Sequence, residues 1–447
     1  MSNDFISIEK MAKSTDIKVK NVERLLTKVN NTEQIDNTCI KLNELPKDIL
    51  DKIVCNYKNL FPSKYILREW VKTASLDWQM LSENPCAIDL LNKRIELEKN
   101  LSKEQYDKLK NIDNKKVNWI MLSKNPEAID ILKKYPKDIV WSSLCDNTNT
   151  RAIDMIKDRI EYEKKLLPYT EHSQHFEHHE HYEHPEPNEK EERGLYRIWW
   201  DRLCCNEHPQ IIEMLKERIE LEKNKEYYIT LNVNDKIDWV QLSANKHPEA
   251  IKLLADNIKK IDWGILSGNP SAIELLKANY DKIIWRYLSI NPNAFELIKD
   301  RVEYEENLKT EEYYKLGAYN NKLCWKYLSG NPCAIELLKA YPNRIHWKEL
   351  SVNPNAIEML KKKPTGIYHY DFYTGLCTNP NAIEILKENK DLIIWKYLSG
   401  NPNALELIKE RAEYESTLKP EEYWNLGSNN RLDWKELSKH KTIFMMV

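Results

Sequence analysis

One short sequence pattern recurs twelve times along the chain, and it constrains the fold more than any other feature. Each copy holds an aromatic residue, a leucine three positions later, then serine or cysteine, and two positions further an asparagine, which is missing only from the last copy. Residues 283–299 and 393–409 are almost identical. A short unit cannot bury its apolar face alone, so neighbouring units must stack on one another. The repetition therefore predicts one continuous array rather than several separate domains.

The aromatic residue of each unit is tryptophan, except in the tenth unit, where it is tyrosine. We number the units 1 to 12 in chain order, and we count positions within a unit from its aromatic residue. The twelve aromatic residues are Trp78, Trp119, Trp141, Trp200, Trp239, Trp263, Trp285, Trp325, Trp347, Tyr373, Trp395 and Trp434. Their regular helical spacing predicts core residues rather than exposed platforms for nucleic-acid bases.

The spacing inside a unit is typical of two short helices. The apolar residue at position −2, the aromatic residue and the leucine at position +3 lie on one helical face. An asparagine followed by proline, such as Asn291 and Pro292, is typical of the N-cap and first position of a second helix. Helices of about 8–10 residues are too short to be stable alone. We therefore expect an all-α protein, an α-solenoid of about twelve αα-hairpin repeats that forms a continuous superhelix with essentially no strand.

The residue at position +4 is serine in most units and cysteine in three. The cysteines are Cys145, Cys204 and Cys377. Serine and cysteine share small size more than hydrogen-bonding strength. The alternation therefore predicts a tight, buried site where the helices cross.

Five units extend their second helix with a charged stretch, at residues 94–100, 159–165, 218–224, 301–307 and 411–417. An arginine and a glutamate four positions apart, such as Arg94 and Glu98, give modest support on a helix surface. Two interpretations stay open. The stretches are longer helices with a solvated charged face, or they are projections that mark one edge of the array as a contact surface.

Residues 168–193 form an insertion in which glutamates alternate with histidines, and which also contains prolines. Low-complexity composition of this kind predicts a disordered, solvated loop. A metal or pH-sensing site is the alternative, because histidine binds metals and titrates near neutral pH. Its candidate ligands are His175, His178, His179 and His181.

The composition excludes several classes of function. Lys+Arg 68 against Asp+Glu 70 leaves a formal charge of −2, which offers no footprint for nucleic acid or for an anionic membrane. No nucleotide-binding or hydrolase motif occurs, so we expect no enzyme activity, cofactor or small-molecule substrate. The chain has no signal peptide or apolar span, and its nine cysteines form no CxxC pair. We therefore expect a cytoplasmic protein.

The residues before the array divide into a helical or flexible segment, 1–41, and a second helical segment, 42–64. The array itself is expected to span 65–447. Residues 42–60 resemble the start of an F-box, a helical module that docks on the Skp1 adaptor of ubiquitin ligases. The matching residues are Leu45, Pro46, Asp48, Ile49, Leu50 and Ile53. The resemblance implies that Leu45, Pro46, Ile49, Leu50 and Ile53 contact such a partner, and it places Trp70 near a common F-box tryptophan. Tyr57 and Lys58 interrupt the expected apolar run, and residues 65–82 read equally well as a cap leading into unit 1.

The pattern W-x-x-L-S-x-N-P-x-A-I-x-L-L resembles the tandem repeats of proteins from giant DNA viruses of the mimivirus group. The resemblance covers residues 70–437 and departs at Tyr373, whose preceding residues lack the usual apolar lead-in. It implies a viral protein in the cytoplasm of a eukaryotic host. Two functions from different classes follow: a non-enzymatic scaffold that binds protein partners, or an F-box-like substrate adaptor that recruits host ubiquitin ligase.

Overall fold

The computed structural model describes residues 65–110, 115–166, 197–317, 319–362 and 370–446. The chain divides into two compact parts, and the larger part, Leu67–Met445, contains the repeated units. The N-terminal segments 1–41 and 42–64 and the insertion 168–193 lie outside the described residues. Within the described residues, helices dominate, and two strands of three residues, β1 (Tyr65–Leu67) and β2 (Phe444–Met446), form a two-stranded sheet. The expected all-α class is therefore confirmed.

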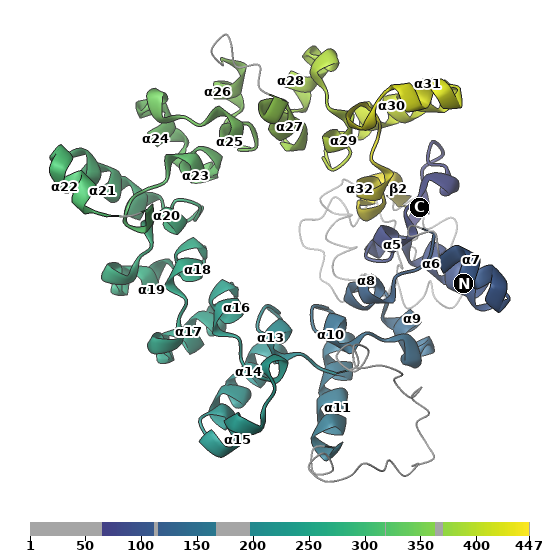
Figure 1. The fold of residues 1–447 in the computed structure, drawn as a ribbon, viewed down its shortest axis with the longest axis horizontal. Helices are drawn as coiled ribbons and strands as arrows, with labels where there is room; N and C mark the ends of the chain where they lie inside the picture. Colours follow the sequence, from purple (N-terminus) through teal and green to yellow (C-terminus); the bar gives the residue numbers. More distant parts are fainter. Residues whose placement is uncertain (1–64, 111–114, 167–196, 318, 363–369, 447) are drawn as a thin grey trace, which may run out of the picture. The chain divides into compact units, whose positions relative to one another are not determined.

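The first helix of every unit contains the aromatic residue, and these helices, which we call the inner helices, follow one another along the inner side of the ribbon (Figure 1). They are α5 (Trp78–Leu81), α8 (Trp119–Lys124), α10 (Trp141–Leu144), α13 (Trp200–Leu203), α16 (Trp239–Ala244), α18 (Trp263–Gly268), α20 (Trp285–Leu288), α23 (Trp325–Gly330), α25 (Trp347–Ser351), α27 (Tyr370–Thr378), α29 (Trp395–Leu398) and α32 (Trp434–Lys439). Most have four to six residues, so they are shorter than expected.

The second helices of the units, which we call the outer helices, lie on the outer side of the ribbon (Figure 1). They are α6 (Ile88–Lys99), α9 (Ile129–Lys134), α11 (Thr150–Leu166), α14 (Pro209–Glu222), α17 (Pro248–Asp256), α19 (Ile273–Ala278), α21 (Phe295–Glu306), α24 (Ile335–Ala340), α26 (Ile357–Lys361), α28 (Ile383–Glu388) and α30 (Leu405–Thr417). In unit 12 a short 3₁₀ turn, Lys441–Ile443, and β2 follow the inner helix instead.

The apolar core lies between the inner and outer helices. The leucine at position +3 is almost completely buried in every unit, and so are alanine and leucine or isoleucine residues of the outer helices, such as Ala294 and Ile298. The aromatic residues are core residues only in part. Trp78, Trp285 and Tyr373 are buried, and the other nine are half-buried.

An asparagine in each of the first eleven units joins that unit to a neighbour. The side-chain amide of Asn291 donates to the carbonyls of Ser267 and Asn269 in unit 6, at 3.0 and 2.8 Å, and its Oδ1 accepts the N–H of Asn293 at 3.0 Å. The same two donations recur at Asn84, Asn125, Asn147, Asn206, Asn245, Asn269, Asn331, Asn353, Asn379 and Asn401. The prediction that this asparagine is the N-cap of the second helix is wrong, because the N-cap of α21 is Ala294, and Asn84 and Asn331 cap only short 3₁₀ turns before their outer helices. The asparagine is instead a cross-link between units.

The serine or cysteine at position +4 makes a second link. The hydroxyl of Ser267 donates to the carbonyl of Trp263 at 2.7 Å and accepts the N–H of Ile284 in the next unit at 3.0 Å. The thiol of Cys377 likewise accepts the N–H of Ile394, at 3.3 Å. The predicted burial of this site is confirmed, because these side chains are almost inaccessible in all units. Small size is only half of the reason for serine and cysteine, since both also accept a buried backbone N–H.

The last unit packs against the first in the same way that consecutive units pack. Asn84 donates to the carbonyls of Ser438 and His440, at 2.9 and 3.2 Å, and the N–H of Asp77 donates to Ser438 Oγ at 3.0 Å. Inner helix α32 contacts α5 beside these bonds. Within Leu67–Met445 the stacked units thus form a closed ring (Figure 1), whereas a continuous superhelix was expected.

Candidate interaction surfaces

The residues named from the F-box resemblance, Leu45, Pro46, Ile49, Leu50 and Ile53, lie outside the described residues, and so do His175, His178, His179 and His181. The structure therefore neither brings these residues together nor separates them.

Trp70 lies inside the described residues, and it belongs to the ring closure. Its ring packs against that of Trp434 with centroids 6.5 Å apart. Beside it, the backbone N–H of Arg68 donates to the carbonyl of Ile443 at 3.0 Å, and its Nε donates to the carbonyl of Thr442 at 2.9 Å. These residues cap the first and the last unit together.

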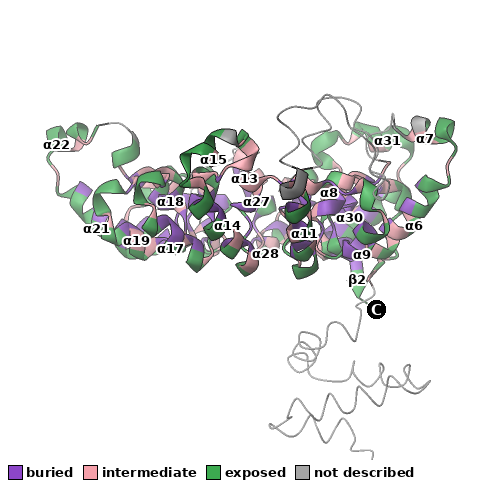
Figure 2. Cartoon of the chain, turned by 90° about the horizontal axis from the view of Figure 1, so that it is seen from below, coloured by how far each residue is buried: buried purple, intermediate pink, exposed green. Residues whose placement is uncertain are grey.

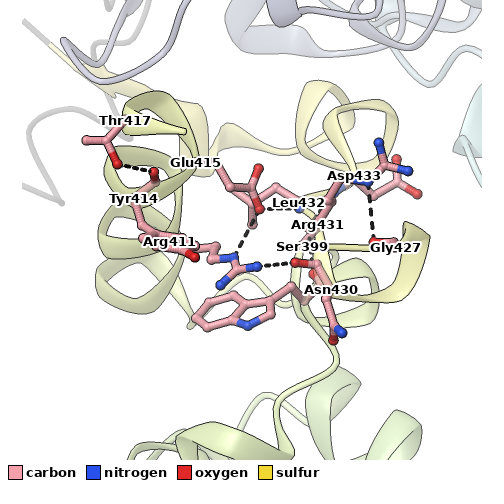
Figure 3. A network of polar contacts seen from close by, with 11 residues as sticks. Ser399, Arg411, Tyr414, Glu415, Thr417, Gly427, Asn430, Arg431, Leu432 and Asp433 are labelled. Atoms are coloured by element: carbon pink, nitrogen blue, oxygen red, sulfur yellow. Dashed lines mark hydrogen bonds and ion pairs between the residues drawn. The ribbon is translucent and has the colours of Figure 1, made fainter. Parts of the chain in front are cut away.

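In the charged stretches of the five long units, the arginine–glutamate pair does not lie on the solvated face, although other charged residues of these stretches, such as Glu413, are exposed. In unit 11, Arg411 pairs with Glu415 at 3.0 Å, and their side chains are only 13% and 5% exposed. Glu415 also accepts the N–H of Leu432 at 2.9 Å, and Arg411 donates to the carbonyl of Asn430 (Figure 3). The guanidinium group lies 4.9 Å from the centre of the Trp395 ring. The pair therefore holds the backbone that leads into the next unit.

The same arrangement recurs in the other long units, so the expectation of a solvated surface pair is wrong. The pairs are Arg94–Glu98, Arg159–Glu163, Arg218–Glu222 and Arg301–Glu305, each with the arginine over the tryptophan of its own unit. Burial raises the pKa of Glu163 and Glu415 above the usual glutamate value, although the paired arginine acts in the opposite direction. An invariant R-x-x-x-E in all five stretches was the sequence signal for this link.

Four helices stand on one face of the ring, and they form the first candidate surface (Figure 2). They are α7 (Lys103–Lys110), α15 (Lys225–Thr230), α22 (Thr310–Lys315) and α31 (Pro420–Asn425). Three of them carry a largely exposed aromatic side chain: Tyr228, Tyr314 and Trp424. Their position agrees with the interpretation of the long units as projections from one edge of the array.

The inner helices provide a second candidate surface, because units 7 to 12 differ from units 1 to 6 at position +1. Five of the last six units have a cation there: Arg286, Lys326, Lys348, Lys396 and Lys435. The first six units have Gln79, Ile120, Ser142, Asp201, Val240 and Gly264. Position +2 holds Tyr287, Tyr327 and Tyr397 in units 7, 8 and 11. We call these five cations and three tyrosines the basic–tyrosine row.

The row is accessible because position +1 lies nearly opposite the buried leucine at position +3 on a helix of 100° per residue. The four lysines are exposed, and so are Tyr287 and Tyr397. Side chains of the row contact one another across units. The guanidinium of Arg286 lies 5.2 Å from the ring centre of Tyr327, and Lys326 Nζ lies 3.3 Å from Glu349 in unit 9.

Lys348 Nζ lies 2.8 Å from Asp371, which raises the pKa of this lysine. The row was missed in the sequence because we compared the units for what they share. A net charge of −2 for the whole chain also conceals a local run of cations.

Other chemistry is sparse among the described residues. No group of three or more histidine, cysteine, aspartate or glutamate side chains there is arranged to hold a metal ion. Cys145, Cys204 and Cys377 are free thiols, and burial raises the thiol pKa of Cys145 and Cys204 and brings that of Cys377 to about 11. No helix in the described part of the chain is both long and apolar enough to cross a bilayer.

Comparisons of the chain with protein-family models, with curated proteins and with solved structures give no significant match.

Proposed function

We propose that the protein is a non-enzymatic scaffold for protein–protein interaction, built as an α-solenoid of about twelve αα-hairpin repeats. The observation that carries the proposal is that different positions of a unit serve packing and exposure. The buried asparagine and serine or cysteine hold neighbouring units together. Position +1 of the inner helices and the projecting helices take no part in these bonds, and apart from the buried Ser142 the side chains at position +1 are at least partly exposed to a partner. A ring with such variable exposed positions suits binding better than catalysis.

The expected partner is a protein in the cytoplasm of the host cell, which is the compartment implied by the viral resemblance. The alternative is a substrate adaptor in which residues 42–64 recruit a Skp1-type protein of host ubiquitin ligase. The two functions differ in what residues 1–64 do. In the scaffold they are dispensable for partner binding, whereas in the adaptor they supply one of the two binding surfaces.

Affinity capture from eukaryotic cell extract tests both. The baits are the full chain, residues 65–447, and the full chain with Ile49→Ala and Leu50→Ala. The scaffold predicts the same set of captured proteins with all three baits. Recovery of Skp1 by the full chain, and its loss from both other baits, would replace the scaffold with the adaptor. Capture of no protein above the level of an unrelated bait would contradict both.

A further inference from the structure

The basic–tyrosine row is not needed to hold the ring together. Units 2 to 6 stack through the same asparagine and serine or cysteine bonds with isoleucine, serine, aspartate, valine or glycine at position +1. Arg286, Lys326 and Lys348 contact Tyr327, Glu349 and Asp371 of the following unit, but units 2 to 6 stack without a cation at position +1. Lys396 and Lys435 are exposed, so their charges face solvent.

We infer that the row binds an extended, acidic protein segment with a carboxylate at about every third residue. This inference rests on the proposed scaffold function and names the partner of that scaffold. The positive side chains from unit 7 to unit 12 are complementary to such a segment, and charge complementarity of this kind governs partner choice and association rate.

The spacing of the units sets the spacing of the partner's charges. Packed helices lie about 8–10 Å apart, and an extended or polyproline-type backbone advances about 3.1–3.4 Å per residue. One unit therefore matches roughly three residues of the partner. A segment that places a carboxylate at that interval meets a cation of the row in every unit from 7 to 12 except unit 10, where position +1 is Thr374.

The exposed apolar groups in the row fit the other residues of such a segment. Tyr287 and Tyr397 are 39% and 36% exposed, and Ile290 and Val352, just after the ends of α20 and α25, are 47% and 45% exposed. Tyrosine presents an apolar ring together with a hydroxyl that can donate to a peptide carbonyl. Apolar side chains or prolines of the segment, placed between its carboxylates, would lie against these groups.

Carboxylates among the cations favour a peptide over a nucleic acid. Glu349 and Asp371 pair with Lys326 and Lys348, and Glu436 follows Lys435. A nucleic acid strand carries a negative charge at every nucleotide, so some of its phosphates would meet these carboxylates. An acidic peptide with a carboxylate only at every third residue has fewer charges that these carboxylates repel.

Fluorescence anisotropy with the full chain tests the inference. The probe is a labelled (Glu-Pro-Pro)5 peptide, and the comparison probes are (Gln-Pro-Pro)5 and a 15-nucleotide oligothymidylate. The test variant is Lys396→Glu with Lys435→Glu. The matched control is Lys216→Glu with Lys299→Glu, which makes the same charge change at exposed lysines of outer helices α14 and α21.

We expect saturable binding of the acidic peptide, at least about tenfold weaker with the test variant and within about twofold of the parent with the control. Circular dichroism of each variant establishes that it is folded. Absence of saturable peptide binding overturns the inference. So does equal weakening by both variants, which would indicate non-specific attraction, or tighter lysine-dependent binding of the oligonucleotide.

The proteins captured from cell extract separate this inference from the scaffold function. If residues 65–447 capture partners that the test variant still binds, the scaffold stands and the row is not its binding surface. If neither partners nor the peptide bind, both proposals fail.

Discussion

At the scale of single residues, the asparagine of each unit has three simultaneous hydrogen-bonding roles. Asn291 accepts one backbone N–H within its own unit and donates to two carbonyls of the unit before it. Aspartate and serine are equally good N-caps, but neither has two side-chain N–H donors. Only asparagine therefore accepts the N–H two residues later and also links to the neighbouring unit.

We predict that Asn291→Asp lowers the free energy of unfolding by about 3 kcal/mol or more at pH 7. The change removes two donors from buried carbonyls and places a carboxylate beside them, and each unsatisfied buried group costs about 1–3 kcal/mol. Urea denaturation followed by circular dichroism measures the loss. Asn293→Asp is the control, because Asn293 makes a single side-chain donation, to the carbonyl of Pro270, at an exposed site. Equal midpoints for the two variants would contradict the proposed link.

Cys377, at position +4 of unit 10, allows the contribution of its hydrogen bond to be separated from that of its small size. Cys377→Ser keeps an acceptor for the N–H of Ile394, and serine fills this position in most other units. We expect it to change stability by less than about 1 kcal/mol. Cys377→Ala leaves the buried N–H without a partner and should cost about 1–3 kcal/mol. If both variants melt at the same temperature, the site needs only a small side chain.

Much of the role of single residues could be predicted from the sequence. The roles that were missed also left a signal in the sequence. The burial of Ser267 and of its equivalents followed from their replacement by cysteine. The second role of Asn291 was missed because a cap explains asparagine sufficiently in any one unit. Eleven units with asparagine, and none with serine, threonine or aspartate, was the signal for a further requirement. The cations of the basic–tyrosine row needed the observed helix bounds before their exposure could be inferred.

At the scale of elements, long units such as unit 11 add a buried ion pair to the 3₁₀ turn, here Ser428–Asn430, that precedes the next inner helix. In a short unit a turn such as Tyr280–Lys282 leads directly to the next inner helix. In a long unit the chain makes an excursion through a projecting helix, and the arginine–glutamate pair holds the returning backbone. Sequence reasoning assigned this pair to the surface, because an i, i+4 pair on a charged helix is usually exposed.

We predict that Arg411→Met costs about 3 kcal/mol at pH 7, because it leaves the Glu415 carboxylate buried without its cation. The double variant Arg411→Met, Glu415→Gln should recover most of this loss, since glutamine still accepts the N–H of Leu432. Lys277→Met, in the exposed pair with Glu274, should change stability by less than about 0.5 kcal/mol. Thermal melts of all variants and of the parent measure the differences.

The loss caused by Arg411→Met should depend on pH in a defined direction. Burial already raises the pKa of Glu415 in the folded state, and removal of the arginine raises it further. Below the unfolded pKa the carboxyl is neutral in both states, so no penalty exists there. The penalty develops as the pH rises from the ordinary glutamate pKa to the raised folded value. A loss that grows as the pH falls would contradict a buried, unpaired carboxylate.

At the scale of the whole molecule, closure distinguishes one junction from all others. Units 1 to 12 follow one another through the covalent chain, whereas units 12 and 1 meet only through noncovalent contacts. These are the bonds from Asn84 and Asp77 to unit 12 and the packing of Trp70 on Trp434. Closure could not be read from the pattern, because it depends on a small rotation per unit that accumulates around the ring.

We predict that Trp70→Ala with Asn84→Ala opens the ring at this junction while leaving most helices folded. The change removes two hydrogen bonds and an aromatic contact, together worth about 2–4 kcal/mol, and no covalent link holds the two units in place. Small-angle X-ray scattering should then show a larger radius of gyration with an unchanged circular dichroism spectrum. Asn291→Ala is the control, since it removes the same two donations at a junction that the chain itself spans. Its radius of gyration should stay that of the parent. An unchanged radius in the double variant, or an equal rise in both, would mean that the contacts between units 12 and 1 do not hold the ring closed.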